Sequence, residues 1–247
     1  NARDWLLLAM LFGLGVSGFL VEALRLHYTQ VVPGFARWSV IGHTIDVTLF
    51  HKLEISTARK LHLGVWWGHS ILVGLFFASI PVTRFLHVLT GPLHIAVRPD
   101  RPVGVLAPLK LEDVERTGRT GVAAMGHFTR PQLLSLDACM ECGRCEEACP
   151  AWASGKPLSP KAVVVNLRNS MSNARGSNKP LHDGVVSAEV LWACTMCQAC
   201  VQECPVLIGH VDLISDLRRH LVGEGQIAGS PAKAMVHIGK QFNVHVH

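Results

Sequence analysis

The chain has 247 residues, of which 49% are hydrophobic and only 17% are charged. This balance is high in apolar residues for a soluble protein and suggests a membrane part joined to a more polar part. All eight cysteines fall in two similar runs, which leaves none for the disulfide framework of a secreted protein and favours a reducing compartment. The net charge of +5 is a modest excess, and we expect no nucleic-acid partner.

Residues 1–90 are predicted to form the membrane part, with a first span over about residues 5–26. The apolar run from Trp5 is long enough for a helix to cross a hydrocarbon core of about 30 Å. Gly13, Gly15 and Gly18 match the dinucleotide-binding fingerprint, but no strand precedes them and no acidic residue lies about 20 positions later. We therefore interpret them as small residues that let helices approach each other in lipid.

The second span is predicted over about residues 64–89, with Trp66 and Trp67 in the interfacial region and a kink at Pro81. Between the spans, residues 39–61 place apolar side chains four positions apart, which predicts an amphipathic segment on the membrane surface or beside the bundle. Two spans leave both flanks in one compartment. Basic residues after the second span and the reduced cysteines assign that compartment to the cytoplasm.

Residues 91–128 are rich in proline and are predicted to be a linker, after which the sequence pattern changes. Residues 129–224 are predicted to be a helical domain, with helix starts at Thr129, Ser159 and Ser187 and an amphipathic helix over residues 212–221. No segment alternates convincingly as a strand, so the predicted fold class is all-α. Residues 225–247 read as a weakly patterned tail.

The cysteines carry the most specific signal, because both runs have the spacing C-x2-C-x2-C-x3-C-P. This is the bacterial pattern for iron–sulfur ligands, in which the fourth cysteine of each run binds the other cluster. We therefore predict one [4Fe–4S] cluster on Cys139, Cys142, Cys145 and Cys204, and a second on Cys194, Cys197, Cys200 and Cys149. Two structural zinc sites are the alternative, but a third evenly spaced cysteine has no role in them.

Two histidines, His69 and His87, are candidate axial ligands of b-type haem. They lie 18 positions apart, which is five helical turns, so in one helix they share a face roughly 27 Å apart. Histidine within a membrane span is costly and usually functional. Interfacial histidines that reach toward water are the alternative, and His62 and His94 are the second choices as ligands. Each haem needs another ligand, so we expect further membrane helices to supply the partners.

Residues 60–98 resemble the last membrane helix of the nitrate-reductase-gamma-like cytochrome b family. Residues 131–222 resemble membrane-bound iron–sulfur oxidoreductases, which include heterodisulfide-reductase-like proteins and electron-transfer-flavoprotein:menaquinone oxidoreductases. The resemblance implies two membrane helices of a cytochrome b-type bundle, an α-helical ferredoxin domain, and one axial ligand of each of two b haems at His69 and His87. Members of this family have further membrane helices before this region and cysteine-rich CCG domains after it. The sequence therefore reads as a partial chain, or a processed one, with those parts on missing segments or partner chains.

The combined reading is an enzyme, a quinone-linked iron–sulfur oxidoreductase of the prokaryotic cytoplasmic membrane, with its iron–sulfur domain on the cytoplasmic side. Electrons are expected to pass from a cytoplasmic donor, with reduced electron-transfer flavoprotein or another flavoprotein as first choice, through both clusters. They then reach the haem at His87, the haem at His69 and the quinone. Two alternatives stay open: a heterodisulfide-reductase-like thiol/disulfide component, and a non-catalytic electron-carrying anchor subunit of a larger complex.

Overall fold

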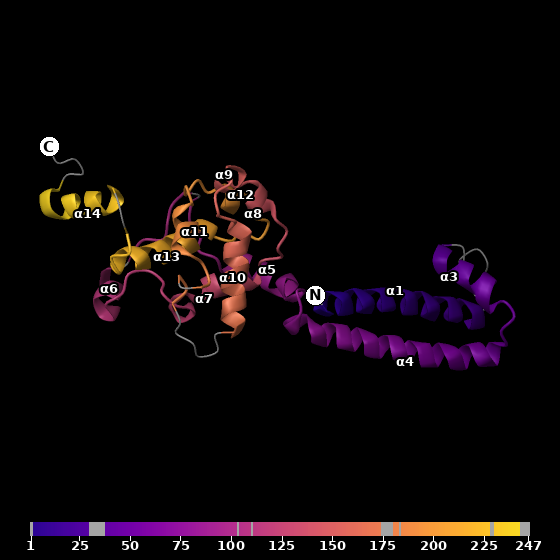
Figure 1. Ribbon diagram of the computed structural model, residues 1–247. Helices are drawn as coiled ribbons and strands as arrows, with labels where there is room; N and C mark the ends of the chain where they lie inside the picture. The colour runs from indigo at the N-terminus through magenta and orange to yellow at the C-terminus, as the bar shows by residue number, and fades with distance from the viewer. Residues whose placement is uncertain are drawn as a thin grey trace. The chain divides into compact units, whose positions relative to one another are not determined.

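A computed structural model describes residues 2–29, 38–102, 104–109, 111–173, 180–182, 184–227 and 230–242 (Figure 1). Every regular element in these ranges is a helix, as the sequence predicted. The chain divides into two compact units, Asn1–Leu86 and His87–His247. The predicted boundary at residue 90 lies close to this division.

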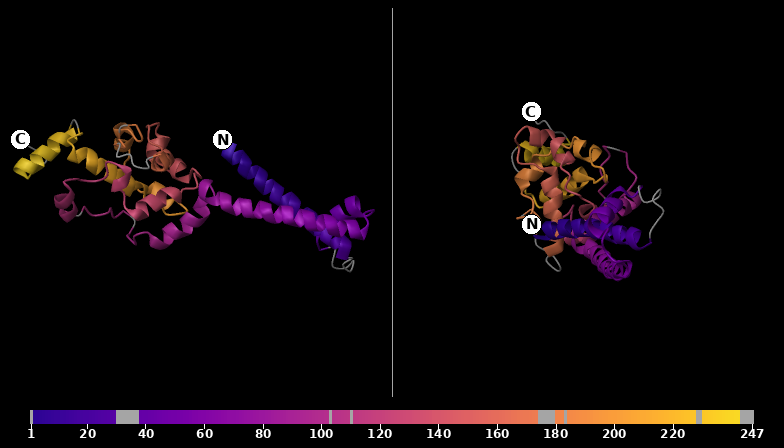
Figure 2. Two further views of the ribbon diagram at one scale, coloured as in Figure 1. Left: turned by 90° about the horizontal axis from the view of Figure 1, so that it is seen from below. Right: turned by 90° about the vertical axis from the view of Figure 1, so that its right-hand side faces the viewer.

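The first unit is a helical hairpin of α1 (Ala2–Thr29) and α4 (Ile55–Ser79), which run antiparallel (Figure 1). In the left-hand view of Figure 2 the two helices separate toward the beginning of α1. Within the residues that the structure describes, two stretches are long and apolar enough to cross a membrane, Trp5–Thr29 and Ile55–Val82. Only 6% of the most apolar window of the first is buried, and none of the second. The apolar side chains therefore face outward, as a lipid environment requires.

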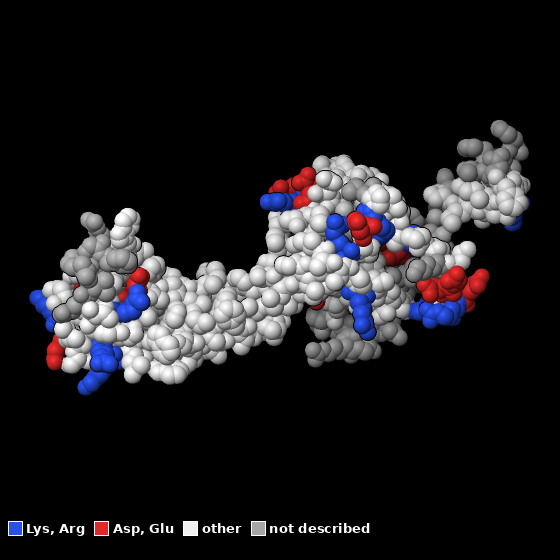
Figure 3. Space-filling model, turned by 180° about the vertical axis from the view of Figure 1, so that it is seen from behind, with Lys and Arg blue, Asp and Glu red and all other residues white. Residues whose placement is uncertain are grey.

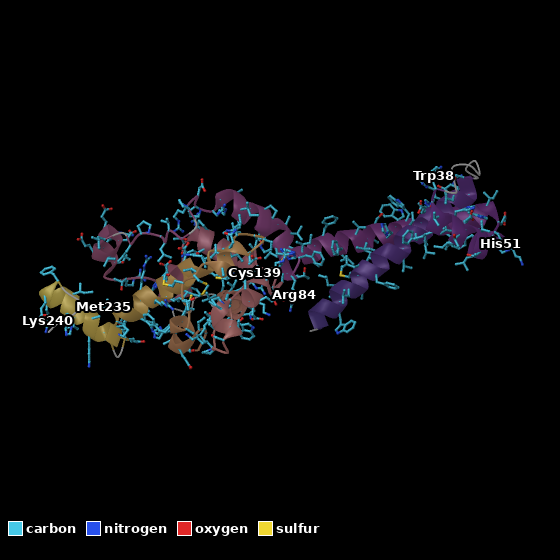
Figure 4. All side chains as sticks on the ribbon, turned by 90° about the horizontal axis from the view of Figure 1, so that it is seen from above. Trp38, His51, Arg84, Cys139, Met235 and Lys240 are labelled. Carbon is cyan, nitrogen blue, oxygen red and sulfur yellow. The ribbon has the colours of Figure 1, made fainter. Side chains whose placement is uncertain are left out.

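The charged residues of the hairpin follow the same logic. On the face in Figure 3 they gather at the end that carries α3, and the adjoining length of α1 and α4 shows no charged side chain. Trp38 and His51 mark this end in Figure 4. A long uncharged stretch beside a charged end is the distribution expected of a membrane hairpin.

The segment between the spans differs from the single amphipathic helix predicted over residues 39–61. It forms α3 (Val40–Ile45) and a π-helical turn (Asp46–Phe50), and α4 then begins at Ile55. The reason is a tether from the end of α1: His27 Nδ1 lies 2.7 Å from Asp46 Oδ1, and its Nε2 lies 2.9 Å from the Leu53 carbonyl. These contacts favour a chain reversal at residues 51–54 over a continuous helix.

The second span also ends earlier than the predicted residue 89. α4 stops at Ser79, a 3-10 turn covers Ile80–Val82, and Thr83 is extended before α5 (Leu86–Val97) begins. Pro81 explains the break, because it has no N–H to donate to the Phe77 carbonyl. Its effect is larger than the predicted kink. The second span is a broken helix, and His87 belongs to the second unit.

The second unit packs short helices around a buried apolar core. It contains α6 (Leu111–Thr117), a 3-10 turn (Met125–His127), α7 (Arg130–Asp137), α8 (Arg144–Glu147), α9 (Pro150–Ala153) and α10 (Pro160–Asn173). It continues with α11 (Ala188–Trp192), α12 (Ala199–Gln202), α13 (His210–Gly223) and α14 (Ser230–Gln241). The predicted helix starts are confirmed: Thr129 caps α7 and forms a capping box with Gln132. Ser187 caps α11 in the same way, by accepting the Val190 N–H.

The predicted linker over residues 91–128 is largely part of this unit. Met125 and Phe128 are buried in its core, and the Val122 N–H donates to the Asp216 carbonyl at 2.9 Å. Thr90 Oγ1 donates to the Asp137 carbonyl at 3.0 Å, which joins α5 to the end of α7. The prolines and glycines shape ordered connections here, so composition was a poor guide. Within the predicted tail, α14 is a helix, and residues 228–229 and 243–247 lie outside the described residues.

Candidate cluster-binding site

Two cavities in the second unit are each lined by four cysteines. The first cavity takes three cysteines from the first run and one from the second: Cys139, Cys142, Cys145 and Cys204. The second cavity takes three from the second run and one from the first: Cys149, Cys194, Cys197 and Cys200. The two sets have the same membership as the two ligand sets predicted from the spacing. Cys139 is labelled in Figure 4, on the connection that follows α7.

The two runs adopt the same local backbone. The second residue after the first cysteine has a positive φ in both runs, 59° at Glu141 and 59° at Met196. The residue after the second cysteine does so again, with φ of 88° at Gly143 and 67° at Gln198. Left-handed residues turn the chain sharply, so that consecutive cysteines of one run face the same cavity. The Met196 N–H donates to Cys194 Sγ at 3.4 Å, as expected of backbone amides that stabilise thiolates.

The fourth cysteine of each run leaves its own loop because proline follows it. Pro150 is the first residue of α9, with Cys149 as the N-cap residue in an extended conformation. Proline suits this position, since its missing N–H would have no partner in the first turn. In the second run, the Ile208 N–H donates to Cys204 Sγ at 3.4 Å. Each of these two cysteines lines the cavity formed by the first three cysteines of the other run.

The two cavities approach each other at Cys145 and Cys200. These buried cysteines share one small apolar group with Val211, and α8 packs against α12. Cys145 is close enough to Cys200 for their Coulombic interaction to raise the pKa of the Cys200 thiol. Centres held in the two cavities would therefore be neighbours.

These sulfurs are better suited to bind iron than to remain free thiols. Burial, assisted by the neighbouring cysteines, raises the pKa of the Cys145 thiol and of the Cys200 thiol to about 12. Four thiolates in such a space need a strongly positive partner. No three His, Cys, Asp or Glu side chains in the described ranges converge on a point suited to one metal ion. Four cysteines arranged around a cavity fit a cluster, which would supply one-electron redox chemistry.

An arginine supports the first cysteine of each run. Arg168 on α10 donates from Nη1 to the Cys139 carbonyl at 2.9 Å, and Arg218 on α13 donates from Nη2 to the Cys194 carbonyl at 2.6 Å. Each follows its cysteine on the first long helix after the run, 29 and 24 positions later. Sequence reasoning missed both residues. The signal for them is a second similarity between the two runs: an arginine on the first long helix that follows each run.

The candidate haem ligands are divided between the two units. His69 lies on α4, and its Nδ1 is 2.8 Å from Ser17 Oγ, which donates its own proton to the Gly13 carbonyl at 2.6 Å. The hydroxyl therefore accepts from Nδ1–H, which leaves the Nε2 lone pair available, as a haem ligand would require. His87 lies on α5, after the break at Pro81. The predicted five-turn relation between His69 and His87 in one helix is therefore wrong.

The second-choice ligands lie elsewhere. His62 packs edge-on against Tyr28, with ring centroids 5.1 Å apart. His94 is buried in the second unit, and this burial lowers its pKa. Ser17, which lies between Gly15 and Gly18 of the apparent fingerprint, is the functional candidate that the sequence interpretation passed over.

Comparison with known proteins agrees with this geometry. Residues 135–208 match the family model described as a 4Fe-4S dicluster domain. The chain is 26% identical to the EtfAB:quinone oxidoreductase of Syntrophomonas wolfei over 98% of its length, and 40% identical to a probable membrane-anchored ferredoxin of Chromohalobacter salexigens over 69%. Over 38% of its length it is 32% identical to one subunit of the ferredoxin:CoB-CoM heterodisulfide reductase of Methanosarcina acetivorans.

The chain spans only part of these relatives, 38%, 30% and 34% of their lengths in the same order. No solved structure shows a significant match to it. The two apolar helices and the membrane-anchored relative indicate a membrane protein. The resemblance of residues 131–222 is confirmed: the chain belongs with the membrane-bound iron–sulfur oxidoreductases and carries a 4Fe-4S dicluster domain.

Proposed function

We propose that this chain is the electron-relay segment of a quinone-linked oxidoreductase, which carries electrons between a cytoplasmic flavoprotein and membrane quinone. The observation that carries the proposal is the pair of four-cysteine cavities, each completed by the fourth cysteine of the other run. Reduced electron-transfer flavoprotein is the first choice of donor, because the Syntrophomonas relative is an EtfAB:quinone oxidoreductase.

The residues of the chain have separate tasks in this scheme. The cysteines of the first cavity would hold one [4Fe–4S] cluster and those of the second cavity the other. His69 would ligate one b haem through Nε2 and His87 another, with the remaining ligands on further membrane helices. The ferredoxin domain would lie on the cytoplasmic side, where its thiols stay reduced. A CCG-type segment or subunit and the quinone site would complete the enzyme.

The exchange of the fourth cysteines gives the direct test. Cys204→Ser is expected to disturb the cluster held by Cys139, Cys142 and Cys145, although Cys204 belongs to the second run. Cys149→Ser is the matched control and should disturb the other cluster. Electron paramagnetic resonance of each reduced variant measures this, beside a wild-type content of about eight iron and eight sulfide per chain. Contents well below this, or a Cys204→Ser effect confined to the second run, would contradict the proposal.

The haem assignment has its own test. A dithionite-reduced spectrum of the protein with its membrane partners is expected to show b-type α-bands. His69→Ala should remove one haem, His87→Ala the other, and neither should change the iron–sulfur signals. Absence of the bands would refute haem binding, and retention of both haems in each variant would refute these ligands.

A heterodisulfide-reductase-like component is the second candidate, and the similarity to the heterodisulfide reductase subunit of Methanosarcina acetivorans favours it. In that case the same clusters would serve a thiol/disulfide reaction on a partner chain, and this chain would be an electron-carrying anchor. The identity of the redox-active polypeptides that copurify with the intact complex separates the two candidates. Flavoprotein-dependent reduction of quinone supports the first, and disulfide reduction supports the second.

A further inference from the structure

The two cysteine loops are nearly equivalent in fold and burial. Cys139 and Cys194 are half-buried, Cys142 and Cys197 are exposed, and the remaining four cysteines are buried, two in each cavity. The left-handed residues occupy the same positions in both loops. Solvent exposure and loop shape therefore give little reason for the two clusters to differ in reduction potential.

The charges beside the loops differ. At the first loop, Arg168 donates to the Cys139 carbonyl and also forms a close ion pair with Glu141 of the same loop. Lys161, which lines the first cavity, is 2.8 Å from Glu146 Oε1. Two positive charges are thus balanced by two carboxylates at the first cavity.

At the second loop the corresponding cation is Arg218, and its contacts within the described part of the chain are with neutral groups. Arg218 donates from Nε and Nη2 to the Leu191 carbonyl, at 2.9 and 2.6 Å, and from Nη2 to the Cys194 carbonyl. Its guanidinium lies 5.0 Å from the Trp192 ring centroid. Carbonyls and an aromatic ring stabilise the cation without cancelling its charge. Among the described residues, no carboxylate forms an ion pair with Arg218, and no Asp, Glu, Lys or Arg lines the second cavity.

We propose that the cluster of the second cavity has the higher reduction potential, because the uncompensated charge of Arg218 favours its reduced form, whereas Glu141 neutralises Arg168 at the first. A reduced cluster carries one more negative charge, so a nearby cation stabilises it and raises the potential. Arg218 is in this sense a tuning residue. The inference rests on the proposed binding of two clusters. It orders the relay: an electron that enters the domain settles on the cluster of Cys194, Cys197, Cys200 and Cys149.

The test is a redox titration of the cluster-loaded full chain in detergent, in which electron paramagnetic resonance monitors the reduction of each cluster. The wild type is expected to show two distinct potentials. Arg218→Gln should lower the higher one and leave the lower one in place, whereas Arg218→Lys, which keeps the charge, should leave both near their wild-type values. Glu141→Gln should raise the lower potential, because it leaves the charge of Arg168 unbalanced. Arg116→Gln, which removes an exposed arginine paired with Asp113, should change neither.

Several outcomes would overturn the proposal: Arg218→Gln lowering the lower potential instead, Arg218→Lys behaving like Arg218→Gln, or Glu141→Gln moving neither potential. If Arg218→Gln cannot hold its cluster, Glu141→Gln still decides, because it leaves the Arg218 contacts intact. Failure of the underlying function looks different. A wild-type chain with fewer than two clusters refutes the proposed relay itself, whereas two clusters with unchanged potentials in Glu141→Gln refute only the ordering.

Discussion

The hairpin of the first unit and the cluster-binding domain of the second use apolar residues in opposite ways. Leu75 on α4 is 57% exposed, whereas Leu136 on α7 is fully buried. Both residues suit a helix equally well, so propensity does not explain the difference. What differs is the solvent: one helix is built to face lipid, while the other must remove its apolar side chains from water. Charged residues follow the same division and gather at the end of the hairpin (Figure 3).

Leucine truncation gives the largest expected contrast between the units. Leu136→Ala removes a fully buried side chain and should destabilise the domain by about 2–5 kcal/mol, through lost transfer energy and a residual cavity. Leu75→Ala should leave the domain unaffected. Chemical denaturation of the detergent-solubilised protein measures the stability of both variants, with loss of the cluster absorbance as the signal of unfolding. An equal effect of the two substitutions would show that the division into lipid-facing and core leucines is wrong.

Glycine substitutions sharpen the contrast at the level of the backbone. Gly121 has φ of +67°, and a Cβ there would lie 2.6 Å from His220 N on α13. Gly121→Ala should therefore cost about 1–3 kcal/mol, because the chain before Val122 would lose its close approach to α13. Gly15→Ala on α1, where nothing lies within 4 Å, should be tolerated. The same denaturation assay measures both variants. An unchanged stability of Gly121→Ala would show that the chain at residue 121 can move away from α13 without cost.

The smallest expected effect concerns Ser17. Ser17→Ala removes the acceptor of His69 Nδ1–H and, at the proposed haem site, should weaken haem retention by about 1 kcal/mol and change the haem potential. Ser17→Thr should restore both. Ser70→Ala, on the same hairpin, removes a hydroxyl that donates to the Trp66 carbonyl of its own helix, and it serves as the control. Identical haem potentials in Ser17→Ala and the wild type would show that Ser17 does not influence the proposed haem site.

Much of the second unit could be predicted from the sequence, because its signals are local. The cysteine spacing predicts which four cysteines line each cavity, and cap residues such as Thr129 and Ser187 mark where helices begin. The prolines were harder to interpret. Pro81 breaks the second span, whereas Pro92 lies inside α5, and the surroundings of each proline decide between these outcomes.

Connections between elements needed the tertiary structure. The amphipathic pattern over residues 39–61 was real, but the contacts of His27 with Asp46 and Leu53 favour a reversal that no local pattern encodes. Likewise, Val122, Met125 and Phe128 are core residues, and this segment is held to α13 by the hydrogen bond from the Val122 N–H to the Asp216 carbonyl.

The all-helical class, the two apolar spans and the grouping of the eight cysteines into two sets follow from the sequence alone, because periodicity and spacing act within a few turns of chain. Only the tertiary structure paired Arg168 with Glu141 and left Arg218 beside Trp192, and only it placed Ser17 against His69. These contacts join residues far apart in the chain, and their effect depends on which charges and hydrogen-bonding groups meet in a low-dielectric interior. Cysteine spacing is therefore enough to predict that the domain carries electrons, whereas the proposed order of the two clusters depends on packing.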